Sequence, residues 1–218
     1  MLSRVLETEV MDTDEDANEY DAMDHTEANA AFVERLLELE ARGRMLDIGT
    51  GPGHIPLLVC ERVADAEVVG IDLAERMLAI AERHRKVSPH RERVSYRKAD
   101  AKGLDFPDAS FDAVFSNTIL HHIPDPLPFL AEARRVLRPG GALLIRDLFR
   151  PDSAERLEEL VSLHAADATP YQRELFGASL HAALTPDELR TYADQAGLNR
   201  AEIRVDSDRH MSLQLRAG

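Results

Sequence analysis

Short apolar runs alternate with amphipathic segments along the middle of this 218-residue chain, and this alternation limits the folds that it can adopt. The apolar runs read RMLDIG, EVVGID, RVSYRKAD, FDAVFSN and GALLIRDLF, and they have the length and composition of buried strands. Most of the segments between them place apolar residues three and four positions apart, as helices do. Strands that alternate with helices predict a parallel sheet with helices on both faces. The sequence therefore predicts a doubly wound α/β fold.

Capping residues mark the ends of several expected helices. Asp125 and Pro126 supply an N-cap and a first-turn proline, and RPGG at 138–141 ends that helix. In TPDELRTYADQAG, Thr185 and Glu188 have the spacing of a capping box, and a glycine follows the last turn. An earlier helix, EANAAFVERLLELEAR, is expected to end at Gly43, with an apolar stripe that covers a sheet edge or a ligand.

We expect a single domain over residues 1–218. The last twenty residues contain two alternating runs around DSD, which predict a β-hairpin rather than another crossover. A helical region near 152–182 interrupts the alternation, and we interpret it as an insertion over the ligand edge of the sheet. The expected parts are an N-terminal helical cap or lid (1–43), a ligand-binding core (44–150), the helical insertion (151–185), and the last helix with the terminal hairpin (186–218).

The charge balance argues against nucleic acid as a partner. Forty acidic and 26 basic residues give a formal net charge of -14, which opposes attraction to phosphate backbones and anionic lipid surfaces. The stretch RHRKVSPHRERVSYRK is locally basic, but it lacks the interleaved aromatic residues of a single-strand binding surface. We therefore interpret it as a solvated face.

Cysteine use and hydropathy predict a cytoplasmic protein. Cys60 is the only cysteine, so no internal disulfide can form, and its apolar surroundings favour a buried small side chain over a reactive thiol. No run approaches the ~20 apolar residues of a membrane-spanning helix. The acidic N-terminal stretch resembles neither a secretory signal nor a basic transit peptide.

The stretch LDIGTGPG, residues 46–53, places three glycines where the first strand turns into a helix. In an open parallel sheet this is the edge where ligands bind, and glycines allow a sharp turn and a close approach. A dinucleotide fingerprint needs a glycine at the sixth position of the pattern, but His54 stands there. Asp47 would also repel a phosphate and attract an ammonium group. The loop therefore predicts a ligand other than a pyrophosphate.

Further polar residues follow the next strands of the predicted sheet. Asp72 ends the second strand, where a carboxylate can accept hydrogen bonds from both hydroxyls of a ribose. Asp100 closes the third strand, where it could accept from an exocyclic amine while the N–H of Ala101 donates to an adenine ring nitrogen. Asn117 follows the fourth strand. This row favours a nucleoside that carries an amino acid.

Four ordered motifs carry a resemblance to a known family: LDIGTGPG, VVGIDLAERML, KADAKGLDFPDASFDAVFSNTILHHIPDP and LRPGGALLIRD. Together they cover about residues 44–148, and with them the chain resembles class I S-adenosylmethionine-dependent methyltransferases. It is most similar to the small-molecule group typified by ubiquinone and menaquinone biosynthesis. The resemblance implies a Rossmann-like, seven-stranded sheet with an antiparallel final strand, S-adenosylmethionine as cofactor with S-adenosylhomocysteine as product, and a small-molecule acceptor.

The resemblance also implies roles for individual residues. The methionine part of the cofactor would lie against Asp47, Gly49, Thr50 and Gly51, with Asn117 on its amine. The ribose and adenine would lie against the following residues: Asp72, Leu73, Met77, Asp100 and Ala101. Tyr20, in NEYDAMDH, would belong to a lid that also holds Met23 and His25, although the same stretch could be an acidic tail.

The sulfonium of the cofactor makes its methyl group electrophilic, so the protein must mainly align a nucleophile for in-line displacement and exclude water. A hydroxyl or a protonated amine would also need a base, for which His121 and His122 are the candidates. The other interpretation is that one of them only holds the loop. Neither the acceptor atom nor the oligomeric state follows from the sequence.

Two arginines near the fifth strand end raise a further choice. Arg146 and Arg150 could clamp an acidic group of the acceptor, or Arg146 could form a surface ion pair with Asp147. No metal site is expected, because His164, His181 and His210 lack the HExxH or CxxC spacing of known sites.

Two other functions remain open at this point. An NAD-dependent oxidoreductase could use the same fold and the acid at Asp72, although His54 and Asp47 disfavour it. A noncatalytic module could retain the cofactor pocket without turnover. Acceptor specificity would lie in residues 1–30 and 150–185.

Overall fold

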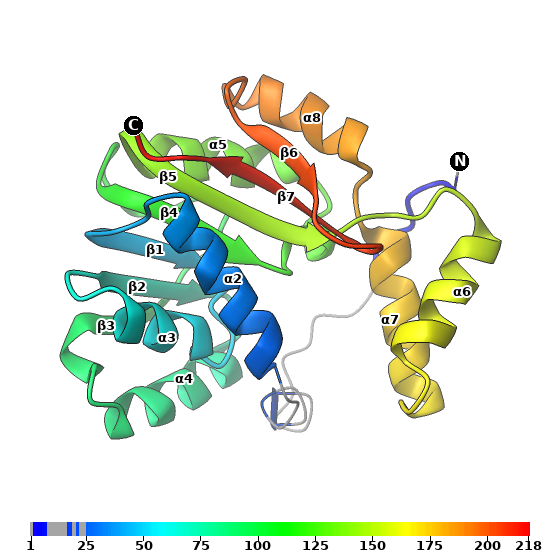
Figure 1. The fold of residues 1–218 in the computed structure, drawn as a ribbon, viewed down its shortest axis with the longest axis horizontal. Helices are drawn as coiled ribbons and strands as arrows, with labels where there is room; N and C mark the ends of the chain where they lie inside the picture. Colours follow the sequence, from blue (N-terminus) through cyan, green and yellow to red (C-terminus); the bar gives the residue numbers. More distant parts are fainter. Residues whose placement is uncertain (1, 8–16, 19–20, 22–24) are drawn as a thin grey trace.

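The computed structural model describes residues 2–7, 17–18, 21 and 25–218. Its centre is a seven-stranded sheet with the order β3-β2-β1-β4-β5-β7-β6 (Figure 1). The strands are β1 (Arg44–Ile48), β2 (Glu67–Asp72), β3 (Val94–Lys98), β4 (Phe111–Asn117), β5 (Leu137–Leu148), β6 (Glu202–Val205) and β7 (His210–Leu215). The first five strands are parallel, whereas β7 runs antiparallel to both β5 and β6. The predicted doubly wound fold, the antiparallel final strand and the terminal hairpin are confirmed.

Helices connect the strands and cover the sheet. They are α2 (Thr26–Glu38), α3 (His54–Arg62), α4 (Glu75–Val87), α5 (Pro126–Val136), α6 (Ala154–His164), α7 (Pro170–Ala182) and α8 (Pro186–Gln195), with short 3-10 turns η1 (Arg91–Arg93) and η2 (Leu120–His122). The predicted caps are present: Asp125 accepts a hydrogen bond from the N–H of Leu127, and Thr185 and Glu188 form a capping box. None of the described helices is long and apolar enough to cross a membrane.

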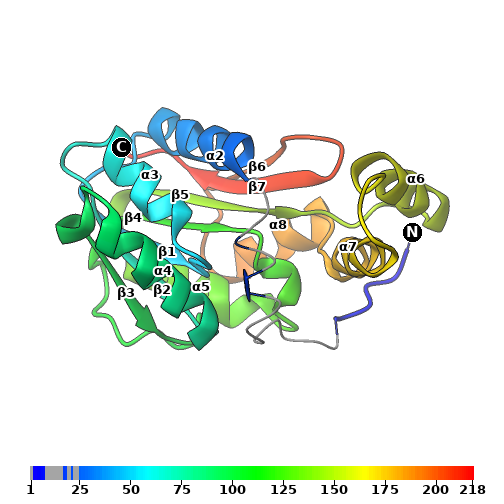
Figure 2. The same ribbon diagram turned by 90° about the horizontal axis from the view of Figure 1, so that it is seen from below.

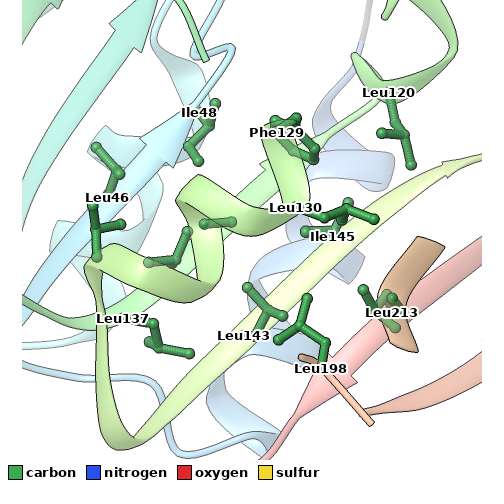
Figure 3. Packing of buried hydrophobic residues seen from close by; sticks show 14 of the residues in the cluster. Leu46, Ile48, Leu120, Phe129, Leu130, Leu137, Leu143, Ile145, Leu198 and Leu213 are labelled. Carbon is green, nitrogen blue, oxygen red and sulfur yellow. The ribbon is translucent and has the colours of Figure 1, made fainter. Parts of the chain in front are cut away.

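Alternate residues of the strands supply two apolar clusters, one on each face of the sheet. Leu46 and Ile48 of β1 point to the face that α5 and α8 cover (Figure 3). Met45 points to the other face, which α2 and α3 cover (Figure 2). The period of two along a strand sorts neighbouring residues to opposite faces. The two layers of helices fix the position of each strand end, and therefore the position of the loops that follow those ends.

Helix α2 differs from the prediction in length and in what it covers. It ends at Glu38 rather than at Gly43, because Glu40 has a positive φ of 61° that a helix cannot include. Its apolar stripe packs on the face of the sheet, where Phe32 meets Phe115 with ring centroids 6.1 Å apart. The stripe is therefore core rather than a cover for a ligand.

Helices α6 and α7 lie beyond the carboxyl end of β5, apart from the two layers (Figure 1). Leu160 of α6 and Leu180 of α7 pack together with Leu148 at the end of β5. The N-terminal segment, residues 2–7, runs beside them: Leu2 N–H donates to the carbonyl of Asp152, and Val5 N–H donates to that of His181. This arrangement brings the N-terminal segment to the edge where the parallel strands end (Figure 1), whereas the N–H of Gly218 donates to the carbonyl of Gly140 near the start of β5.

Replacing Phe32 by alanine should weaken the fold, because it empties a site that is only 2% exposed. A buried Phe to Ala change typically costs about 3–5 kcal/mol. Urea unfolding followed by circular dichroism measures this loss. Leu163→Ala is the control, since Leu163 is 65% exposed and its loss should change stability by no more than about 0.5 kcal/mol. Equal effects of the two changes would contradict the assignment of α2 to the core.

Candidate functional site

The glycine loop, residues 49–53, joins β1 to α3 at the carboxyl edge of the sheet. Gly49, Gly51 and Gly53 all have positive φ values, between 53° and 80°. Their surroundings differ, because a Cβ on Gly49 would collide with Ile119 and one on Gly53 with Tyr96, whereas one on Gly51 would meet no described atom within 4 Å. Of these three glycines, only Gly51 has open space where a Cβ would lie. At Gly49 and Gly53 the missing side chain makes room for Ile119 and Tyr96, so packing also requires glycine there.

Asp72 fixes the position of the glycine loop. Its Oδ2 accepts a hydrogen bond from the N–H of Gly51 at 2.8 Å, and its Oδ1 accepts one from the N–H of Ala74 at 2.9 Å. A carboxylate oxygen can accept more than one hydrogen bond, so this group has the chemistry to bind hydroxyls. The next residue, Leu73, is 52% exposed and presents an apolar surface beside the carboxylate. A carboxylate next to an apolar platform suits a ribose with an attached base.

Asp47 lies beneath the loop and does not line it. The side chain is 1% exposed, and Oδ2 accepts a hydrogen bond of 2.7 Å from Thr50 Oγ1. Burial raises the pKa of Asp47 to about 7; the hydrogen bond from Thr50 opposes the rise and the charge of Asp72 adds to it. Any attraction of Asp47 for an ammonium group therefore acts through the loop, as a charge in a region of low dielectric constant.

Of the residues assigned to adenine, Asp100 and Ala101 follow β3 and Met77 lies in α4. Asp100 Oδ1 accepts hydrogen bonds from the N–H and the Nζ of Lys102, and the bond from that side chain lowers the pKa of Asp100. Met77 is buried in a small cluster with Ala17 of the N-terminal part of the chain. The predicted lid residues Tyr20 and Met23 lie outside the described residues.

The end of β4 contains a strained residue. Thr118, directly after Asn117, has a φ of 61°, and a positive φ is rare for a β-branched side chain. Its N–H donates to the carbonyl of Arg146 at 2.8 Å, which holds the turn in place. The Asn117 amide oxygen lies 3.5 Å from Nη1 of Arg146. Strain of this kind concentrates at functional sites.

His121 and Asp147 form a buried pair. Nδ1 of His121 lies 2.6 Å from Oδ1 of Asp147, and the two side chains are 5% and 3% exposed. Burial alone lowers the pKa of His121, but the charge and hydrogen bond of Asp147 outweigh it and raise that pKa. Asp147 also accepts hydrogen bonds from the backbone N–H groups of Leu120, His121 and Leu148. The imidazole thus has one fixed orientation, with the Nδ1–H on the carboxylate.

This pair corrects the interpretation of the arginines. Asp147 does not form a surface ion pair with Arg146, whose nearest carboxylate is that of Asp206 at 3.9 Å. Burial lowers the pKa of Arg146. Arg150 is only 6% exposed and donates to the carbonyls of Leu2 and Ala183 and to Glu188. Arg150 therefore holds the N-terminal segment, and the predicted clamp of two arginines is not formed.

Sequence reasoning missed the part that the N-terminal segment plays. The carboxylate of Glu7 pairs with Nδ1 of His122 and accepts a hydrogen bond from Ser179 Oγ. Arg4 donates to the carbonyls of Ile123 and Pro124. No spacing rule connects Glu7 to His122, 115 positions later, because this contact exists only after the chain has folded.

Comparisons with known proteins agree with this geometry. A family model described as a methyltransferase domain matches residues 46–145. The 27-O-demethylrifamycin SV methyltransferase of Amycolatopsis mediterranei is 37% identical over 175 residues, which are 79% of this chain and 61% of that protein. The demethylmenaquinone methyltransferase of Thermotoga maritima is 30% identical over 72% of this chain and 70% of its own length.

A solved structure has the same fold. It is phosphoethanolamine N-methyltransferase 2 of Haemonchus contortus in complex with phosphomonomethylethanolamine and S-adenosylhomocysteine, which is 26% identical with a TM-score of 0.68. The match covers 88% of this chain but 44% of that one, and the chain likewise spans only part of the length of its curated relatives. The oxidoreductase alternative finds no support in these matches. The chain belongs to the family of class I S-adenosylmethionine-dependent methyltransferases, of the ubiquinone and menaquinone type.

Proposed function

We propose that this chain is an enzyme that transfers the methyl group of S-adenosylmethionine to a small-molecule acceptor by in-line displacement. The observation that carries this proposal is the hydrogen bond between Asp72 and the N–H of Gly51, beside the open space at Gly51 and the exposed Leu73. These features together fit an amino-acid-bearing nucleoside. Relatives that act on 27-O-demethylrifamycin SV and demethylmenaquinone support a small-molecule acceptor.

In this proposal the two carboxylates of the site have different tasks. Asp72 accepts the ribose hydroxyls, and Leu73 packs on the base. Asp47, beneath the loop, stabilises the ammonium of the methionine part by its charge, with Asn117 as a direct partner. Asp100 and Ala101 take the adenine edge, with Met77 beneath it, and Tyr20 is proposed to close over the cofactor. The open space beside Gly51 gives room for the carbon atoms of the cofactor that join its sulfur to its amine.

We further propose that the acceptor atom is a hydroxyl oxygen. S-adenosylmethionine supplies an electrophilic methyl group, so a hydroxyl acceptor needs in addition only alignment and a base for its proton. His121 would take this proton on Nε2, and Asp147 would stabilise the imidazolium that results. The buried carboxylate also fixes the tautomer that leaves Nε2 able to accept. Arg146 is the remaining candidate to bind an acidic group of the acceptor, because Arg150 is already engaged. His122 pairs with Glu7 and so helps to hold the N-terminal segment.

Gly51→Ala should weaken binding of S-adenosylhomocysteine at least about tenfold, because the new methyl group occupies ligand space; that factor corresponds to ~1.4 kcal/mol. Isothermal titration calorimetry measures the affinity. Gly197→Ala is a matched control, since Gly197 also has a positive φ, of 77°, and open space beside it but lies after α8. Both changes should lower stability by about 1–2 kcal/mol, the cost of a left-handed residue. Equal affinity in the two variants would contradict the placement of the ligand at Gly51.

Asp47→Asn should stabilise the free protein at pH 8 but not at pH 4. Burial raises the pKa of Asp47 from 3.8 to about 7, so its favourable contribution is complete below about pH 4 and is lost as the pH rises through about 7. Asparagine cannot ionise and retains the hydrogen bond from Thr50. Thermal unfolding across this pH range tests the effect. The same variant should bind S-adenosylhomocysteine more weakly at pH 8, and unchanged affinity there would exclude a role of this charge in binding the amine.

Incubation with methyl-labelled S-adenosylmethionine and a cell extract tests the activity itself. We expect label in one or a few small molecules, and about a 100-fold or greater loss of transfer in His121→Asn with unchanged S-adenosylhomocysteine affinity. His122→Asn, the control, should retain most of the activity. The pH at which transfer reaches half its maximum should fall in Asp147→Asn, because the carboxylate that raises the pKa of His121 is gone.

Three outcomes would contradict the proposal. Binding of S-adenosylhomocysteine without label in any molecule would indicate a noncatalytic module. Tight binding of NAD with no binding of S-adenosylhomocysteine would indicate an oxidoreductase. Full activity of His121→Asn across the pH range would contradict only the role of His121 as the base, and the proposed methyltransferase activity would stand.

A further inference from the structure

Two histidines beside the glycine loop face one carboxylate of the N-terminal part of the chain. His54 begins α3 directly after the loop, and His84 lies in the last turn of α4. Their rings are stacked, with centroids 4.6 Å apart. Nε2 of His54 lies 2.8 Å from Oδ1 of Asp21, and Nε2 of His84 lies 3.4 Å from Oδ2 of the same residue. Neither the fold nor the proposed methyl transfer requires this arrangement.

The tautomer of His84 makes the arrangement unfavourable without a cation. Nδ1 of His84 lies 2.9 Å from the carbonyl oxygen of Pro52, and a carbonyl can only accept, so Nδ1 must carry the hydrogen. With the hydrogen on Nδ1, Nε2 is an acceptor, and it lies 3.4 Å from Oδ2 of Asp21, which is also an acceptor. Two acceptors that face each other need a proton or a metal ion between them.

We propose that Asp21, His54 and His84 bind one divalent transition-metal ion, such as Zn²⁺, and that this ion fixes the N-terminal part of the chain to the glycine loop. Two imidazoles and one carboxylate are ligands of Zn²⁺, Co²⁺ and Ni²⁺ rather than of Mg²⁺ or Ca²⁺. A backbone carbonyl on the second nitrogen of a histidine is the usual support of a metal ligand, and Pro52 supplies it here.

The distances fit such an ion with small adjustments. Ligand atoms around a tetrahedral Zn²⁺, with bonds of about 2.0–2.1 Å, lie roughly 3.3 Å apart. The ligand atoms of this cluster all lie within 4.8 Å of one another, and the two contacts to Asp21 bracket the ideal value. The three side chains are 20–38% exposed, so an ion can reach them and water can take the fourth position.

A second cluster among the described residues, made of Glu7, His121 and His122, is the less suitable of the two. Nδ1 of His121 already bonds to the buried Asp147, and a metal ion there would compete with the proposed base. His122 thus offers a control variant that leaves the Asp21 cluster intact.

The position of the cluster gives the ion a consequence for the cofactor. Ala17, four residues before Asp21, packs on Met77, which is one of the residues assigned to the adenine side. His54 follows Gly53 of the glycine loop directly. An ion that joins Asp21 to the two histidines would therefore also hold Ala17 against the cofactor site. This coupling depends on the proposed function, whereas metal binding itself does not.

Calorimetric titration of ZnCl₂ into the full chain, purified without a histidine tag and stripped with EDTA, tests the site. We expect one ion per chain, visible absorption bands of four-coordinate geometry with Co²⁺, and no binding of Mg²⁺. Asp21→Asn and His84→Phe should each weaken Zn²⁺ binding by about 100-fold or more, because even changes to supporting residues cost about 10–100-fold. Phenylalanine can still stack on His54. His122→Phe should bind Zn²⁺ as the unaltered chain does.

Several results would overturn the site. One is an absence of Zn²⁺ binding by the unaltered chain. Another is Zn²⁺ affinity in Asp21→Asn and His84→Phe equal to that of the unaltered chain. The third is a loss of binding in His122→Phe, which would place the ion at the other cluster. Circular dichroism and thermal unfolding confirm that each variant is folded.

A second measurement tests the link to the cofactor site. Saturating Zn²⁺ should tighten S-adenosylhomocysteine binding by a factor within the usual range of about 5–150, and by linkage the ligand should tighten Zn²⁺ binding by the same factor. The effect should be absent in His84→Phe. Zn²⁺ binding with no such coupling would overturn the proposal that the ion fixes Ala17 and Asp21 beside the cofactor site. Zn²⁺ binding with no affinity for S-adenosylhomocysteine would instead contradict the proposed function.

Discussion

The hydrogen bond from the N–H of Gly51 to the carboxylate of Asp72 is the contact on which the ligand edge depends. It joins the loop after β1 to the end of the neighbouring strand β2, so two segments that are distant in sequence share one fixed geometry. Asp72 can make it only because β1 and β2 are parallel and in register, with Ile48 beside Ile71. The same carboxylate binds the N–H of Ala74, which begins the next connection. The position of the Asp72 charge, the geometry of the glycine loop and the register of β1 with β2 therefore depend on one another.

Two carboxylates buried near this edge are stabilised in different ways. Asp147 has a histidine and three backbone N–H groups, and the charge of His121 lowers its pKa in spite of burial. Asp47 has a hydroxyl as its partner, and its pKa rises to about 7. Removing a charge from water is costly unless partners replace the lost hydration. The incompletely compensated Asp47 is the one that a cationic ligand would stabilise, which is consistent with its proposed role.

Contacts from the N-terminal part of the chain reach two places on the ligand edge. Residues 2–7 contact η2, α7 and the buried Arg150 through Arg4, Glu7 and Leu2. Ala17 and Asp21 contact the adenine side and the histidines beside the glycine loop. Two described parts of the N-terminal region thus lie beside the proposed acceptor and cofactor sites. A metal ion at Asp21 would act on the second of these parts and leave the reacting groups untouched.

The sequence alone determined the alternation of strands and helices, the caps at Asp125 and Thr185, and the row of polar residues at the strand ends, because each of these follows from local periodicity or from chain direction. It could not show that Ile119 and Tyr96 pack against Gly49 and Gly53, that Asp147 pairs with His121 and not with Arg146, or that Glu7 meets His122. Nor could it bring Asp21 to His54 and His84. These pairings join segments far apart in the chain, and only the packing of the helices and of the N-terminal segment against the sheet brings them within reach. Burial, which sets the pKa of Asp47, likewise exists only in the folded protein.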